Sequence, residues 1–70
     1  MNFINSDSSI IRKIGYDAVN LILEVMFERG ATYQYFDVDY VTMVNFVFAK
    51  SQGAYLNRSI AKEFKYEQIN

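Results

Sequence analysis

The chain of 70 residues contains no cysteine, no histidine and no proline. Without cysteine, no disulfide can staple the fold and no thiolate chemistry is available. Without histidine or cysteine, a zinc ion would need a shell made only of carboxylates, which is uncommon. We therefore expect neither a metal nor a cofactor. A core of this size supplies only about 3–5 kcal/mol, so self-association is the expected further source of stability.

Long apolar runs are also missing. The longest mostly apolar segment, 40–49, is interrupted by Thr42 and Asn45. It is far shorter than the roughly 18 residues of a membrane span. The first residues have neither the basic nor the apolar region of a secretory signal. We expect a cytoplasmic protein with no membrane contact. Hydrophobic residues still make up 51% of the chain, too many for disorder, so one domain is expected over residues 1–70.

Charge of either sign is sparse, and the formal net charge is −1. Residues 1–49 carry three basic and six acidic side chains, whereas residues 50–70 carry four basic and two acidic ones. The C-terminal third is therefore mildly basic and can attract an anion. Four cations are a weak signal for nucleic acid.

Three segments that alternate in twos predict strands over residues 9–17, 21–27 and 31–36. Arg12 interrupts the alternation of the first. A three-residue loop, 28–30, with Gly30 in a left-handed conformation predicts that Val25 pairs with Tyr33 and Leu23 with Tyr35. We prefer this register to a two-residue loop because it places like faces together.

Helical periodicity begins after the third strand. Asp37 or Asp39 can cap a first helix that runs to about Lys50 and stops near Gly53. A second helix is expected over 54–63, and the tail 64–69 is either a short strand or an extended clasp. The expected fold is therefore α+β: a three-stranded antiparallel β-meander followed by two helices packed on one sheet face, with a short C-terminal strand as an option.

The order and spacing of several short motifs resemble the KTSC domain family over residues 6–69. These motifs are Ser8-Ser9-x-Ile11, Ile14-Gly15-Tyr16-Asp17, Leu23-x-Val25-x-Phe27-x-x-Gly30, Tyr33-x-Tyr35 with Val38, Ala49-x-Ser51-x-Gly53-x-Tyr55 and Asn57-x-x-Ile60. Asp39 stands where the family often has proline. Members occur alone or at the C-terminus of some lysyl-tRNA synthetases. That attachment implies RNA as a candidate ligand, while the family's function is not established.

One candidate site is an interface for nucleic acid or another anion. Tyr33 and Tyr35 can stack on bases, or can belong to the core. Ser51 and Gly53 can offer backbone N–H groups to a phosphate, or can simply end one helix and cap the next. The basic side chains form either a phosphate-binding stripe or a solvated face, and they are Lys50, Arg58, Lys62 and Lys65.

The other candidate site is an apolar interface for a protein. Ile22, Met26 and Phe36 fall on the sheet face opposite the expected core. The alternative is that an N-terminal arm with Phe3 and Ile4 covers them. The first helix is apolar around most of its circumference, more than one sheet face needs. The excess must meet the second helix, another subunit or a partner, and Met43 and Phe46 are candidate residues of a protein interface.

Enzyme chemistry is not expected. The acidic pairs Asp37 with Asp39 and Glu24 with Glu28 lack a second catalytic group, and no glycine-rich phosphate loop is present. The preferred function is a non-catalytic protein-interaction module, either a homodimer or an adaptor or inhibitor that docks on a larger protein. The alternative is binding of RNA or a single strand. Cellular and phage origins both remain open.

Overall fold

The computed structural model describes all residues, 1–70, and contains an antiparallel sheet of five strands in sequential order. The strands are β1 (Asn2–Asn5), β2 (Ile11–Asp17), β3 (Ile22–Phe27), β4 (Thr32–Tyr35) and β5 (Tyr66–Gln68). The α+β class is confirmed and the optional C-terminal strand is present as β5, but the prediction of a three-stranded meander missed β1. The two additional strands form the edges of the sheet: β1 beside β2 and β5 beside β4.

The hairpin between β3 and β4 has the predicted register. Leu23 pairs with Tyr35 and Val25 with Tyr33, and the Phe27 N–H donates to the Ala31 carbonyl over 2.8 Å. Gly30 has a φ of 103°, a left-handed conformation that favours glycine. The match between apolar faces and the glycine turn therefore decided the pairing.

A bulge explains the interrupted alternation of β2. The register shifts between Ile11 and Lys13, so Arg12 is the extra residue. Ile11 and Ile14 consequently both point into the core, where they are 0% and 2% exposed. Ile10, which a strict alternation would place on the same side as Ile14, is exposed instead.

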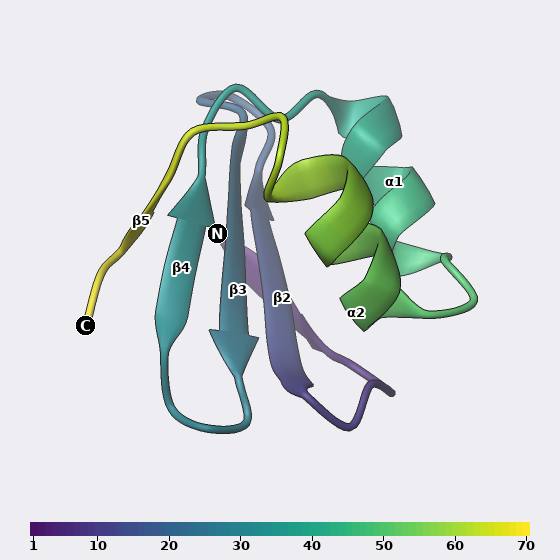
Figure 1. Cartoon of the computed structure of the whole chain (residues 1–70). Coiled ribbons are helices and arrows are strands. Elements are labelled where there is room, and N and C mark those ends of the chain that lie inside the picture. The colour runs from purple at the N-terminus through teal and green to yellow at the C-terminus, as the bar shows by residue number, and fades with distance from the viewer.

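The helical segments cover one face of the sheet, as Figure 1 shows. The first helix, α1 (Tyr40–Val47), begins after Asp39 at its N-cap and is shorter than expected. A second helix, α2 (Gln52–Tyr55), runs directly into the π-helical turn η1 (Leu56–Ile60). Ser51 caps α2, because its hydroxyl accepts the Ala54 N–H over 3.3 Å.

The core lies between the sheet and this helical layer. Nine buried apolar residues form it: Ile11, Ile14, Leu23, Val25, Tyr35, Val38, Phe46, Leu56 and Ile60. Phe46 is 0% exposed, so its predicted place on a protein interface was wrong. The large apolar residues exposed in this segment are instead Tyr40, Val41 and Phe48.

The other sheet face carries no helix. Phe3 of β1 pairs with Gly15 of β2 on this face, and a Cβ at Gly15 would lie 2.4 Å from the Phe3 Cε1. Gly15 is therefore needed for the ring to pack on the strand. The N-terminal segment, purple in Figure 1, extends the sheet rather than forming a covering arm.

Candidate functional site: an aromatic groove

A groove of about 460 Å³ lies between the end of the β3–β4 hairpin, strand β5 and the turn η1. Its sheet side is formed by Phe27, Tyr33, Tyr35 and Tyr66. Leu56, Asn57 and Ala61 line it from the helical layer, and Ser9 and Ile10 from the segment before β2. We call this the aromatic groove. Its volume falls in the range of about 300–1,000 Å³ that is usual for ligand sites.

The rings of the groove contact one another in a chain. Phe27 meets Tyr33 edge to face with centroids 5.7 Å apart. Tyr66 lies 5.7 Å from the Tyr33 centroid and 5.4 Å from that of Tyr35. This spacing is that of favourable aromatic pairs. The sheet register causes it, because Tyr66 is the cross-strand partner of Tyr35 in β5.

The charges at the groove largely cancel. Arg29 places its guanidinium carbon 4.9 Å from the Phe27 centroid, within reach of a cation–π interaction. Glu28, its neighbour, also lines the groove. Burial raises the pKa of Tyr35 to about 12, and Tyr33 and Tyr66 add to the rise. The Tyr35 hydroxyl is therefore neutral at pH 7 and can donate a hydrogen bond.

The two predicted tyrosines have different exposures. Tyr35 is 3% exposed and belongs to the core, so it cannot serve as an open platform for a base. Tyr33 is half-buried and packs against the core from inside the groove. The most exposed ring of the groove, Tyr66 at 51%, was not singled out from the sequence. The sequence pattern that could have indicated Tyr66 is the alternation over residues 64–69, which is typical of a strand. Once that strand pairs with β4, Tyr66 lies beside Tyr35.

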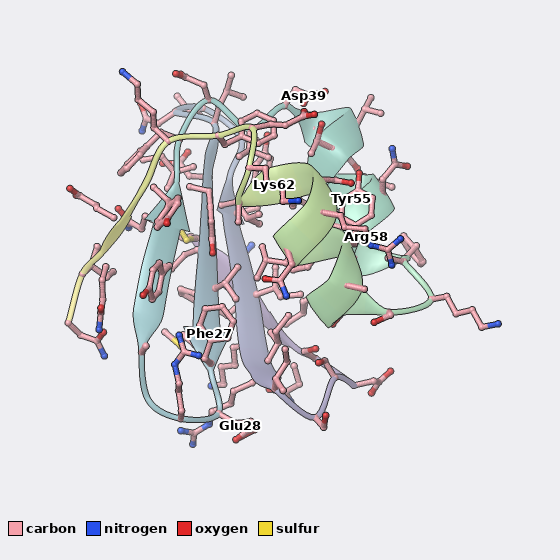
Figure 2. The ribbon with its side chains drawn as sticks, in the orientation of Figure 1. Phe27, Glu28, Asp39, Tyr55, Arg58 and Lys62 are labelled. Atoms are coloured by element: carbon pink, nitrogen blue, oxygen red, sulfur yellow. The ribbon has the colours of Figure 1, made fainter.

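The structure divides the predicted anion-binding set. Lys50, Ser51 and Arg58 line a second hollow of about 530 Å³ on the helical layer. In Figure 2, Arg58 and Lys62 lie on that layer, well separated from Phe27 and Glu28 at the hairpin end. Lys62 and Lys65 are exposed and line neither hollow.

Gly53 was also predicted to face an anion, and that prediction was wrong. The residue is buried, and a Cβ there would lie 2.8 Å from the Ile10 Cδ1. Its role is close packing between α2 and the segment before β2. Ser51 uses its hydroxyl for the helix cap, as the simpler interpretation had it.

The predicted apolar patch is only partly open. Ile22, Met26 and Phe36 are half-buried on the sheet face without helices. Phe3 shares that face, while Ile4, of the opposite parity in β1, lies on the helical side near Met43. Met43 itself packs against the core.

Two of the four carboxylates considered for catalysis have hydrogen-bond partners within the chain. Glu24 accepts a hydrogen bond of 2.8 Å from the Gln34 amide. Asp39 accepts the Thr42 hydroxyl, and that hydrogen bond lowers the pKa of Asp39. No group of three or more acidic side chains is arranged to hold a metal ion. None of the helices has both the length and the apolar character required to cross a bilayer.

The sequence model of the KTSC domain family matches residues 7–64 of this chain. The lysine–tRNA ligase of Trichormus variabilis is 30% identical over 67 residues, which are 96% of this chain and only 12% of the ligase. A protein of Tsukamurella paurometabola is 34% identical over 59 residues, 84% of this chain and 88% of that protein.

A solved structure agrees in fold. The crystal structure of a KTSC domain protein from Yersinia pestis superimposes with a TM-score of 0.90 at 37% identity, covering 99% of this chain and 97% of that one. The match therefore extends over both edge strands and the helical layer. The chain belongs to the KTSC domain family.

Proposed function

We propose that this domain is a non-catalytic binding module that holds a short apolar segment of a partner protein in the aromatic groove. The observation that carries the proposal is the continuous wall of Phe27, Tyr33, Tyr35 and Tyr66 along one hollow. Concave, mostly apolar sites with a few polar groups favour ligands that bury side chains. Tyrosine is also enriched among the residues that dominate protein-binding energies.

The backbone of β5 offers a second contact to an extended partner segment. The Phe36 N–H bonds the Lys65 carbonyl and the Ile69 N–H bonds the Thr32 carbonyl. Because direction alternates along a strand, the N–H and C=O of Tyr66 and Gln68 point to the outer edge of the sheet. A segment that adds to this edge gains backbone hydrogen bonds while one side chain enters the groove.

The local charge favours a protein over a nucleic acid. Arg29 and Glu28 nearly cancel at the groove, so affinity there comes from apolar burial rather than from phosphate neutralisation. The cations Lys50 and Arg58 line a different hollow from the tyrosines. A single strand would need its stacking and phosphate contacts on one continuous path.

RNA is the second candidate ligand. It is supported by the hollow that collects Lys50, Ser51 and Arg58, and by the ligases that carry a similar domain. Such binding would weaken steeply with salt. It would depend on Arg58 rather than on Tyr66.

Selection from a phage library of random 12-residue peptides tests the proposal. We expect enriched peptides that share an aromatic or leucine anchor and bind with little dependence on salt. Titration calorimetry should show at least a tenfold loss of affinity for Tyr66→Ala. Phe48→Ala, which removes another exposed ring outside the groove, is the matched control and should bind normally. Peptides that bind Tyr66→Ala as well as the wild type would refute the groove.

A further inference from the structure

Strand β1 forms a sheet edge that nothing in its sequence protects. Natural edge strands usually carry a charge, a proline or a bulge that prevents pairing with another chain. The sequence of β1 is Asn-Phe-Ile-Asn, with none of these, and its pairing with β2 has no shift of register. The opposite edge, β5, contains Glu67 and follows Lys65. Only the β1 edge is therefore open to pairing without a charged side chain.

The hydrogen-bond direction along β1 identifies its free groups. The Ser6 N–H bonds the Arg12 carbonyl of the neighbouring strand over 3.1 Å. Antiparallel partners alternate between bonded and non-bonded pairs, so Asn2 and Ile4 also direct their backbone toward β2. The N–H and C=O groups of Phe3 and Asn5 consequently point to the open edge.

Helix α1 extends the same uncharged surface. Charged residues make up 21% of the chain, yet none lies in β1 or α1. The Tyr40 ring lies 6.4 Å from Tyr16 of β2, whereas Phe46 stacks on Tyr55 at 6.2 Å and faces α2. The side of α1 that carries Tyr40 is therefore turned away from α2, and Val44, one turn on, shares it.

An apolar hollow lies where the two elements meet. It has a volume of about 240 Å³ and is lined by Ile4, Ile14, Tyr16, Met43 and Val47, among others. Ile4 is 48% exposed and Tyr40 63% exposed. The surface thus has the composition of an interface centre, where aromatic residues and methionine are enriched and charged residues depleted.

We propose that a second copy of this chain occupies this surface, with the two β1 strands paired antiparallel about a two-fold axis. Cross-strand neighbours must point to the same sheet face. Placing Ile4 against Ile4 of the second copy satisfies this rule and aligns each Phe3 with Asn5 of the other copy. About four backbone hydrogen bonds then form between the open groups. The two five-stranded sheets become one.

Self-pairing fits this patch better than a charged partner does. A residue at a two-fold axis faces its own copy, so a charge at the position of Ile4 would meet a like charge. The patch has none. The Ile4 pair closes the hollow beside Met43 and Val47, and the α1 helices flank the axis with Tyr40 and Val44. The contact is small, so a weak and concentration-dependent dimer is expected. The aromatic groove lies elsewhere and stays open.

Sedimentation velocity from low micromolar to millimolar concentration tests the dimer. We expect the weight-average sedimentation coefficient to rise toward the dimer value with the wild type. Ile4→Lys introduces a charge at the axis and should weaken dimerisation at least tenfold. Ile69→Lys is the matched control, because Ile69 has a similar exposure, 44%, beside the opposite edge strand. It should dimerise as the wild type does.

Amide hydrogen exchange gives a second measurement that does not depend on a variant. The Phe3 and Asn5 amides should exchange quickly in dilute protein and become protected, by at least tenfold, at the concentration where dimer forms. A wild type that stays monomeric at millimolar concentration would overturn the proposal. So would a dimer that Ile69→Lys disrupts and Ile4→Lys does not, or one in which Phe3 and Asn5 remain unprotected.

Discussion

Substitution of Gly15 by alanine should destabilise the domain through a single steric contact. The added Cβ would lie 2.4 Å from the Cε1 and 2.6 Å from the Cδ1 of Phe3, and 2.9 Å from the sulfur of Met1. Contacts of this length force the Phe3 ring from its place on β2. Overpacking of this kind costs about 1–3 kcal/mol. Because β1 is an edge strand with only β2 as neighbour, we expect the displacement to loosen β1 and leave the core intact.

The same substitution should behave differently once the ring is gone. With Phe3→Ala, two of the three nearest contacts of the new methyl group are removed, and the third is the end of the flexible Met1 side chain. Alanine in a strand is then favoured over glycine by about 0.5–1 kcal/mol. The double variant should consequently be as stable as Phe3→Ala alone or more stable. The interaction energy between the two substitutions should therefore be about 2 kcal/mol.

Urea denaturation followed by circular dichroism measures all four free energies of unfolding. Low micromolar protein keeps self-association out of the comparison. The denaturant slope should stay constant across the set, since the core still unfolds as a unit. Equal losses from Gly15→Ala in the presence and absence of the Phe3 ring would refute the reasoning, because the cost would then have another origin.

Five further substitutions test the core, the groove and a helix cap. Phe46→Ala should lower the unfolding free energy by about 3–5 kcal/mol and leave the domain largely unfolded. Phe48→Ala, at an 82% exposed position, should change the unfolding free energy by less than about 0.5 kcal/mol. Thermal melts distinguish the two variants. The pKa of Tyr35 is about 12 in the folded protein, against 10.0 for the free side chain. Its contribution to the unfolding free energy should therefore be fully present below pH 10 and should fall by up to about 2 kcal/mol as the pH rises toward 12. Urea denaturation at several pH values across this range should show a smaller fall for Tyr35→Phe. Ser51→Ala should cost about 0.5–1 kcal/mol in urea denaturation, because the Ala54 N–H loses its partner at the start of α2, and Ser51→Asn should restore most of it.

The central hairpin was predictable because several local signals agree. Apolar alternation in both strands and the left-handed preference of Gly30 require the same register, and the pairing of Val25 with Tyr33 follows. The end strands carry weaker signals. β1 has four residues, two of them asparagine, and its place depends on Phe3 meeting Gly15, a contact visible only in three dimensions.

The orientation of α1 was not predictable from its sequence. An apolar stripe indicates which side of a helix is buried, but α1 is apolar around most of its circumference. Its orientation was set by tertiary contacts, chiefly the stacking of Phe46 on Tyr55. Phe46 was consequently placed on the surface, while the exposed Tyr40 and Val41 were missed.

Only part of the candidate site could be predicted from the sequence. Tyr33 and Tyr35 stood out, but Tyr66 and Arg29 are separated from each other by more than half the chain. They line the same groove only because β5 pairs with β4. The basic residues suggested a single stripe. Arg58 instead lies on the helical layer, away from the groove. That position depends on how η1 packs, and no local pattern in the sequence indicates it.

Nuclear magnetic resonance titration of the ¹⁵N-labelled domain with a selected apolar peptide tests the central claim most directly. The amides of Phe27, Tyr33, Asn57 and Tyr66 should shift together, with the same affinity at 50 and 500 mM salt, while Arg58 stays unchanged. A single-stranded RNA of 12 nucleotides should leave these amides in place. Shifts centred on Arg58 with RNA that vanish at high salt, and none in the groove with any selected peptide, would contradict the account.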